Sequence, residues 1–295
     1  MASRAADLWA ISKPRILYLL LVVAWSAMFV AARGWPDGKA FLAVTLAGAF
    51  SVASSGAFNH VLERHRDARM KRTADRPVAS GRLAVRHAVA YGLVTGALSF
   101  ASLAVLQLWV AAALTVAAIL YYVVIYTILL KPATPQNIVI GGLAGSFPAL
   151  IGWAAQTGGL GWPAVLPALV LALLVFLWTP AHFWALALLY KEDYAAAEYP
   201  MMPNVRGETS TRRQVVVYAI LTALCSGAVL VVYRGGWTYL VAAAALGAWL
   251  VARAVRMHQA PSPKAYRSFF FLTIQYLGLL LVALMVDQAG PRLPF

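Results

Sequence analysis

The sequence has few charged residues. Asp, Glu, Lys and Arg make up 12% of its 295 residues, whereas a soluble domain has about 25%. Apolar residues make up 62% of the chain, and its mean hydropathy is +0.75. A water-soluble globule of this composition would leave too much apolar surface in water. Intrinsic disorder is excluded as well, because disordered chains are poor in apolar residues.

Cysteine is also scarce. Cys225 is the only one in the sequence, which excludes a disulfide within the chain. It lies in an apolar run, so we expect a small, unreactive core residue there.

Long apolar segments account for most of the chain. A helix needs about 20 residues to cross a bilayer, and no segment alternates as a barrel strand would. The first segment is longer than the apolar region of a signal peptide and eight more follow it, so we expect it to be retained. The sequence predicts an all-α polytopic membrane protein with one domain over 1–295. Its nine transmembrane helices form one bundle with a central cavity open to the cytoplasmic face. The predicted spans are 16–32, 40–61, 87–106, 109–130, 138–156, 163–190, 214–233, 237–255 and 268–286.

The basic residues predict the orientation of the bundle. Of the 24 Lys and Arg residues, 20 fall in the N-terminal tail and in the second, fourth, sixth and eighth loops. Cytoplasmic loops carry such an excess. We therefore expect a cytoplasmic N-terminus and a C-terminus on the opposite face. The net charge of +14 is then a topology signal and does not indicate nucleic-acid binding, because no soluble recognition domain accompanies it.

Acidic residues are rarer still, and their positions are informative. Seven of the ten lie in two cytoplasmic loops: Glu63, Asp67, Asp75, Glu192, Asp193, Glu198 and Glu208. Asn59, Glu63 and Asp67 are four residues apart, so a helix would place them on one face. Three oxygen donors suit Mg²⁺, which also binds substrate phosphates, and nearby arginines can grip phosphate oxygens. The alternative is a basic loop that sets topology and contacts anionic lipid.

Two further positions carry open hypotheses. Asp193 follows an aromatic span end and is either a ligand of a second Mg²⁺ or an ordinary loop acid. His182 lies inside a span, in the segment 178–184 with sequence WTPAHFW. An ionisable residue within a span is a candidate functional residue. The alternative is a neutral histidine bonded to a carbonyl near the kink at Pro180.

The residues resemble a known family. Asn59-x3-Glu63-x3-Asp67, followed by Arg72-Thr73 and Arg76-Pro77, is similar to the first acidic signature of the UbiA superfamily of intramembrane prenyltransferases. The match is to its protoheme IX farnesyltransferase (heme O synthase) branch. Further matching segments are 13–15, 126–131, 137–142, 148–153, 178–188, 193–194, 200–203 and 207–214. The sequence departs from the pattern at Glu63, where Asp is usual, and at 132–133, Ala181, Ala197 and Glu198.

The resemblance implies a reaction and a set of roles. It implies transfer of a farnesyl group from farnesyl diphosphate to a vinyl group of heme b, giving heme O for heme-copper terminal oxidases. It implies that Mg²⁺ is held by Asn59, Glu63, Asp67 and Asp193. It places Arg66, Arg72, Arg76 and Lys131 on the diphosphate, and His182 and Trp178 on the heme. The high Ala and Arg content indicates a bacterium, so we expect an enzyme of the bacterial inner membrane, in contact with lipid, with heme A synthase or oxidase assembly proteins as candidate partners.

Other functions remain open from the sequence. Within the superfamily, the acceptor could be a quinone-ring precursor or a chlorin, but the segment 178–184 favours heme. A polytopic transporter would show inverted repeats and ionisable groups near the midplane, whereas these acids lie at one face. A heme-binding subunit without catalytic activity would show paired histidines inside the membrane, and only His182 lies deep in a span.

Overall fold

The computed structural model describes residues 3–233 and 235–290, and every regular element within these ranges is a helix. The all-α prediction is therefore confirmed. The elements are α1 Arg4–Ile11, α2 Pro14–Ala32, α3 Gly38–Asp67, α4 Val85–Ala104, α5 Trp109–Leu120, η1 Tyr121–Leu130, α6 Asn137–Gly141, η2 Gly142–Ser146, α7 Phe147–Thr157, α8 Leu166–Leu189, α9 Lys191–Ala196, α10 Met202–Val205, α11 Glu208–Tyr233, α12 Trp237–Gln259 and α13 Pro263–Ala289.

Nine helical stretches in the described part of the chain are long and apolar enough to cross a membrane. They match the nine predicted segments in order, with α5 and η1 forming the fourth and α6 to α7 the fifth. The second span differs most at its C-terminal end, because α3 continues as a helix to Asp67. The acidic residues that follow the apolar segment therefore lie on the same continuous helix.

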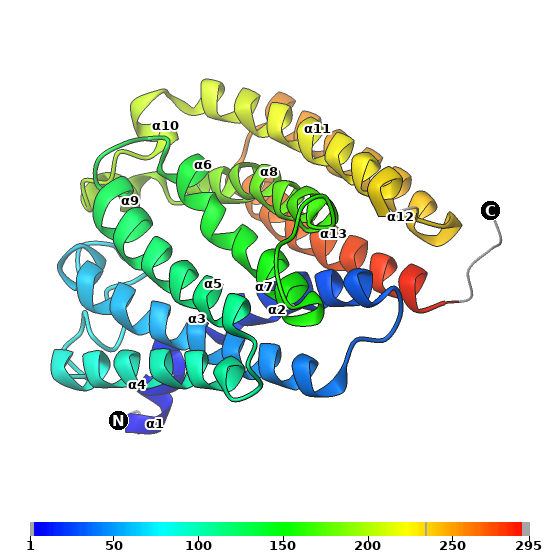
Figure 1. Cartoon of the computed structure of the whole chain (residues 1–295). Helices are drawn as coiled ribbons and strands as arrows, with labels where there is room; N and C mark the ends of the chain where they lie inside the picture. The colour runs from blue at the N-terminus through cyan, green and yellow to red at the C-terminus, as the bar shows by residue number, and fades with distance from the viewer. Residues whose placement is uncertain (1–2, 234, 291–295) are drawn as a thin grey trace.

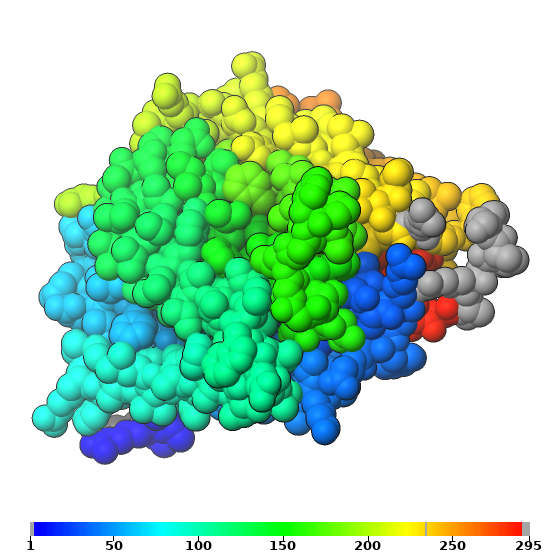
Figure 2. All heavy atoms as spheres, viewed as in Figure 1, coloured from blue at the N-terminus to red at the C-terminus, as the bar shows by residue number. Residues whose placement is uncertain are grey.

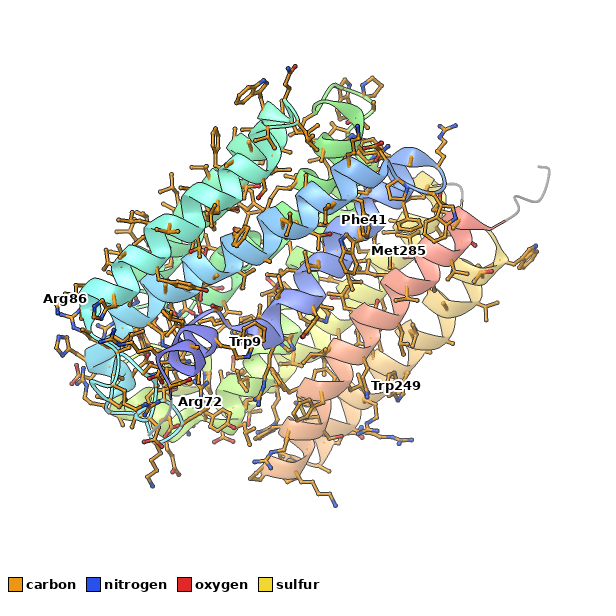
Figure 3. The ribbon with its side chains drawn as sticks, turned by 90° about the horizontal axis from the view of Figure 1, so that it is seen from below. Trp9, Phe41, Arg72, Arg86, Trp249 and Met285 are labelled. Carbon is orange, nitrogen blue, oxygen red and sulfur yellow. The ribbon has the colours of Figure 1, made fainter. Side chains whose placement is uncertain are left out.

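The helices pack side by side as one bundle, and the segments that connect them lie at its two ends (Figure 1). α1 lies at one end of the bundle and the C-terminal end of α13 at the other. Arg72 and Arg86 lie at the same end as Trp9 of α1, whereas Phe41 and Met285 lie toward the opposite end (Figure 3). The predicted gathering of basic and acidic loops at one end is thus observed. The assignment of that end to the cytoplasm stays a prediction.

Small residues let the helices approach closely, as helices do in lipid. A Cβ atom at Gly152 of α7 would collide with the Ala24 carbonyl of α2, and one at Gly56 of α3 would collide with the Ile11 carbonyl. Of the nine spans, α8 is the most buried. It packs against α11 and α13, and its Trp184 is fully buried. The segment 178–184 therefore lies in the interior.

Many large apolar side chains are exposed on the outside of the bundle, one face of which is drawn in Figure 2. Leu93, Val105 and Val231 expose 62%, 75% and 77% of their surface. Such a surface suits contact with lipid and would be unfavourable in water. Cys225 is buried, as predicted for a small core residue.

Candidate active site

The three predicted oxygen donors share one buried face of α3. Asn59, Glu63 and Asp67 expose only 2%, 4% and 0% of their surface. The four-residue spacing therefore holds on a continuous helix, as predicted. Buried polar groups need partners, and each of these three side chains has a basic one.

Two of the basic partners form ion pairs with the carboxylates. Lys131 donates to Glu63, and this lysine follows directly on η1. Arg76 donates from Nη1 to both carboxylate oxygens of Asp67, at 2.9 and 2.8 Å. Arg76 lies in the segment 68–84 that folds back over the end of α3. Two residues predicted to bind phosphate are thus held against two residues predicted to bind metal.

The third basic partner was not among the predicted site residues. Lys13 Nζ donates to Asn59 Oδ1 and to the hydroxyl of Tyr122, the latter at 3.0 Å. Lys13 adopts a left-handed backbone conformation, with φ of 51°, between α1 and α2. Non-glycine residues rarely adopt this conformation, and it is enriched at functional sites. Asn59 Nδ2 in turn donates to Thr127 Oγ1 at 3.3 Å.

The π-helix η1 brings its polar residues to the same side. Tyr122 and Thr127 are five residues apart, as are Tyr126 and Lys131, and a π-helix repeats its hydrogen bonds at this spacing. Thr127 Oγ1 donates to the Tyr122 carbonyl at 2.9 Å, and the Lys131 N–H donates to the Tyr126 carbonyl at 2.9 Å. In an α-helix such residues would point about 140° apart. The π-helix therefore lets both pairs face α3, and nothing in its apolar sequence signals this register.

The remaining predicted phosphate-binding residues lie over aromatic rings. The Arg66 guanidinium is 4.7 Å from the centre of the Tyr199 ring, and that of Arg72 is 4.8 Å from the centre of the Tyr190 ring. In the described ranges neither arginine has a carboxylate within ion-pair distance. Their positive charge is therefore available to an anionic ligand.

Charge in the site is also reflected in two pKa values. Burial alone would lower the pKa of Lys131, but the Glu63 carboxylate outweighs it, and the pKa lies well above its ordinary value. Burial raises the pKa of Tyr199 to about 12. At neutral pH, Lys131 is therefore a cation and Tyr199 a neutral phenol. The Lys131 ammonium lies 4.7 Å from the centre of the Tyr199 ring.

Of the acids in the second acidic loop, Asp193 lies at this end of α3, whereas Glu198 points to the surface. The Asp193 carboxylate accepts the backbone N–H groups of Lys71 and Arg72, each at 3.3 Å. It therefore ties α9 to the segment after α3. Glu198 pairs with Arg69 at 3.0 Å on the surface, where 75% of the glutamate side chain is exposed.

The donor set is compatible with Mg²⁺ but does not form a complete protein cage. Among the residues that the structure describes, no three His, Cys, Asp or Glu side chains converge as metal ligands. Mg²⁺ usually keeps several waters and takes one or two carboxylates together with substrate phosphates. Glu63 and Asp67 are buried oxygen donors that attract cations in this structure. Their chemistry therefore fits a metal that arrives with phosphate.

His182 is held between two aromatic side chains. Its ring stacks on Trp178 at 4.3 Å and on Phe270 at 4.4 Å between centres. Its Nδ1 lies 2.7 Å from Thr273 Oγ1, and that hydroxyl donates to the Phe270 carbonyl at 2.6 Å. Because the single hydroxyl proton is committed to the carbonyl, Oγ1 accepts from Nδ1–H. This tautomer leaves the lone pair on Nε2. The expected alternative, a direct bond to a carbonyl near Pro180, is replaced by a bond to α13.

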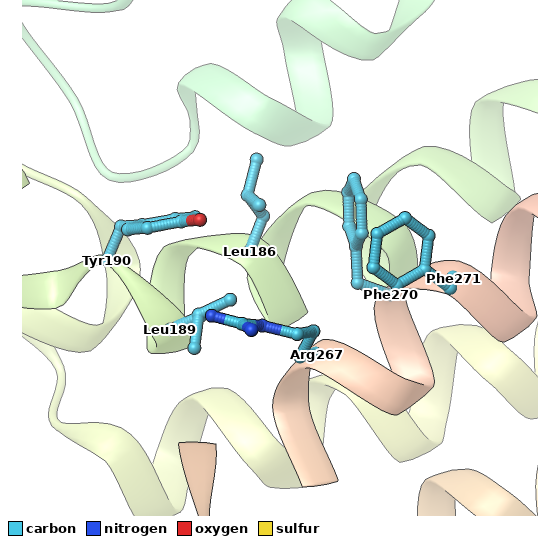
Figure 4. A pocket seen from close by; sticks show the side chains of 6 residues that line it. All are labelled: Leu186, Leu189, Tyr190, Arg267, Phe270 and Phe271. Atoms are coloured by element: carbon cyan, nitrogen blue, oxygen red, sulfur yellow. The ribbon is translucent and has the colours of Figure 1, made fainter. Parts of the chain in front are cut away.

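Two hollows open beside this cluster, between the end of α8 and the start of α13. The smaller measures about 350 Å³ and the larger about 930 Å³. The smaller is lined by Leu186, Leu189, Tyr190, Arg267, Phe270 and Phe271 (Figure 4). The larger shares Leu189 and Tyr190 and extends to Arg72 and Asp193. The predicted central cavity stays a prediction.

Comparison with characterised sequences gives close relatives. The chain is 45% identical over 291 residues to a protoheme IX farnesyltransferase of Haloarcula marismortui, covering 97% of this chain but 61% of that protein. It thus spans about three fifths of the length of that relative. It is 42% identical over 289 residues to a protoheme IX farnesyltransferase of Clavibacter michiganensis subsp. michiganensis, covering 97% of this chain and 92% of that protein.

Comparison with solved structures supports the fold. A UbiA homolog from Archaeoglobus fulgidus, solved bound to DMAPP and Mg²⁺, superimposes with a TM-score of 0.60. The match covers 95% of this chain and 99% of that one at 15% identity, so it bears on the fold alone. The sequence pattern of the UbiA prenyltransferase family matches residues 19–275. The nine apolar helices and this match agree on an integral, multi-pass membrane protein. The chain belongs to the UbiA prenyltransferase family.

Proposed function

We propose that this protein transfers a farnesyl group from farnesyl diphosphate to a vinyl group of heme b. The product is heme O, which heme-copper terminal oxidases use. One observation carries the proposal. Asn59, Glu63 and Asp67 place their side-chain oxygens on one buried face of α3, and lysine and arginine side chains contact each of them. The names of the two relatives support heme as the acceptor. The prenyl diphosphate and Mg²⁺ in the Archaeoglobus fulgidus protein support the donor and the metal.

Four residues would hold the metal. Asn59, Glu63 and Asp67 offer oxygen atoms from α3, and Asp193 offers a carboxylate from α9. When bound, Mg²⁺ neutralises part of the charge on the diphosphate oxygens. Asp193 also holds the N–H groups of the loop after α3. It therefore positions that loop in addition to any contact with metal.

The basic residues stabilise the leaving group. As the allylic C–O bond breaks, negative charge grows on the diphosphate oxygens. Fixed cations lower the energy of that state more than that of the bound substrate. Arg66 and Arg72 have only aromatic partners and can turn to phosphate without losing an ion pair. Lys131 and Arg76 exchange a carboxylate oxygen for a phosphate oxygen when the substrate binds.

The surroundings of the site keep water from the allylic cation. Tyr122 and Tyr126 of η1 and Tyr199 lie beside the α3 face, and aromatic faces stabilise positive charge. The cation then takes the electron pair of the heme vinyl group. The new carbon–carbon bond leaves a positive charge on the other vinyl carbon. Water adds to that carbon and loses a proton, which gives the hydroxyl group of heme O.

His182 would ligate the heme iron through Nε2, and Trp178 would line the macrocycle. Histidines that bind metals donate their other ring N–H to a second group, and the bond from Nδ1 to Thr273 fits this pattern. We place the enzyme in the bacterial inner membrane, where the lipid bilayer accommodates the farnesyl tail. A heme A synthase or oxidase assembly proteins would take up the product.

The acceptor can be tested by competition. Purified protein receives farnesyl diphosphate and Mg²⁺ with heme b, an aromatic acid precursor of a quinone ring, and a chlorin. We expect prenylation of heme b alone. Prenylation of the aromatic acid or of the chlorin instead would assign the enzyme to another acceptor within the family.

A further inference from the structure

The smaller hollow between α8 and α13 contains one charged side chain in an otherwise apolar wall. Arg267 extends from α13 toward Leu189 of α8 (Figure 4). The Arg267 side chain is exposed and, within the described part of the chain, makes no hydrogen bond or ion pair. A guanidinium group is a strong, bidentate donor to carboxylates and phosphates. Its position without a partner against an apolar wall favours a ligand with an acidic edge.

The other lining residues favour a flat apolar body for the same ligand. Phe270 and Phe271 lie 5.4 Å apart at 74°, and Tyr190 and Leu186 face them across the hollow (Figure 4). Aromatic rings pack well against planar ligands. The volume of about 350 Å³ falls within the range of roughly 300–1,000 Å³ typical of ligand sites. Phe271 is 56% exposed, so the hollow opens toward the side of the bundle that faces lipid.

The position of Arg267 along α13 relates the hollow to His182. Thr273, which holds His182, lies six residues further along the same helix. This separation corresponds to about 9 Å along the helix axis and about 120° around it. Phe270, midway between the two residues in the sequence, stacks on His182. A macrocycle with one carboxylate at Arg267 can therefore extend inward along Phe270 toward His182.

The hollow also borders the diphosphate end of the site. It shares Leu189 and Tyr190 with the larger hollow, which is lined by Arg72 and Asp193. Both reactants then meet at one end of the bundle without crossing the membrane.

We propose that Arg267 binds a propionate carboxylate of the tetrapyrrole acceptor, with the macrocycle edge in the hollow between α8 and α13. The acceptor enters from the lipid side past Phe271. This inference rests on the proposed function, because heme b is the acceptor there. It adds the site, the anchoring residue and the acidic group that the residue recognises.

Binding titrations test the proposal directly. Heme b and its propionate dimethyl ester are titrated by absorbance into purified protein in neutral detergent, without farnesyl diphosphate. Arg267→Gln is compared with Arg267→Lys, which keeps the charge. Lys264→Gln is the matched control, because Lys264 lies one turn earlier on α13 and lines neither hollow. We expect Arg267→Gln to weaken heme b binding about tenfold or more. Arg267→Lys should fall between it and the wild type, and Lys264→Gln should bind as the wild type does.

The ester separates carboxylate recognition from general damage. Wild-type protein and Arg267→Gln should bind the dimethyl ester equally, and the KM for farnesyl diphosphate should not change. Unaltered heme b binding by Arg267→Gln, or an equal loss for the ester, would overturn the assignment. The titrations are repeated in vesicles of anionic lipid. An effect of Arg267→Gln seen only in these vesicles would also overturn the assignment, since Arg267 would then bind lipid headgroups. The proposed function fails separately, by the absence of heme O from wild-type reactions.

Discussion

Lys131, at the end of η1, forms a buried ion pair with Glu63 on α3. The exposed fraction is 11% for the lysine side chain and 4% for the glutamate side chain. Isolated charges are expensive to bury, so each residue holds the other in place. Together with the Arg76–Asp67 pair, this contact keeps oxygen donors and phosphate-binding cations within one site.

Neutralising the carboxylates of α3 should abolish turnover. Glu63→Gln and Asp67→Asn each remove a metal-binding oxygen charge, and we expect kcat/KM to fall at least about a hundredfold. The measurement is heme O formation by purified protein, with folding checked by gel filtration. Asp75→Asn is the control, because Asp75 is an exposed acid of the same loop. Full activity in both site variants would exclude the metal assignment.

Breaking one side of the buried ion pair should lower stability. Lys131→Met leaves the buried Glu63 carboxylate without its ion-pair partner, which costs about 3–5 kcal/mol. The double variant Glu63→Gln, Lys131→Met buries no charge and should regain most of that loss, yet stay inactive. Thermal unfolding midpoints in detergent give the comparison. Equal midpoints for the single and the double variant would mean that the pair is not buried as the structure has it.

Glu198 should be dispensable. It forms an exposed pair with Arg69, and such pairs contribute at most about 1 kcal/mol. We expect Glu198→Gln to keep its activity within about threefold of the wild type, a change worth less than about 1 kcal/mol, with the dependence on Mg²⁺ concentration unchanged. A large rise in the Mg²⁺ concentration required for turnover would instead assign Glu198 to the metal.

Thr273 should control heme ligation through His182. His182→Ala removes the proposed ligand and should alter the Soret spectrum of bound heme b. Thr273→Val removes the acceptor of Nδ1–H, and we expect heme binding to weaken about ten- to a hundredfold. His87→Ala, at an exposed histidine, is the control. A Soret spectrum in His182→Ala identical to that of the wild type would remove His182 from iron ligation.

Removal of divalent metal should stop the reaction reversibly. Wild-type protein treated with EDTA should form no heme O, and added Mg²⁺ should restore the rate. Binding of heme b alone should be unaffected, because Arg267 and His182 lie outside the proposed metal ligands. Turnover at the full rate in EDTA would contradict the role of metal in this site.

The spans and the face of α3 could be predicted because each depends on local sequence. Lipid requires about 20 apolar residues per helix, and a four-residue spacing fixes one face of a helix. The positions of Arg66 and Asp193 near the end of α3 also followed from loops that share one end of the bundle.

The remaining contacts depend on tertiary structure. Lys13 reaches Asn59 across 46 residues, and His182 reaches Thr273 across 91 residues. No local pattern links such pairs. Tyr122 and Thr127 face the site because η1 is a π-helix, and an apolar segment does not distinguish a π-helix from an α-helix. Glu198 lies in the acidic loop by sequence, but its backbone at φ of 56° and its pair with Arg69 direct it outward.

The most direct measurement is the mass of the product. Membranes that contain the wild-type protein or Glu63→Gln are incubated with heme b, farnesyl diphosphate and Mg²⁺, and the extracted tetrapyrroles are analysed by mass spectrometry. The account predicts a species at the mass of heme O, heme b plus a farnesyl and a hydroxyl group, with the wild type only. Absence of that species from the wild-type membranes, or its equal formation with Glu63→Gln, would contradict the account.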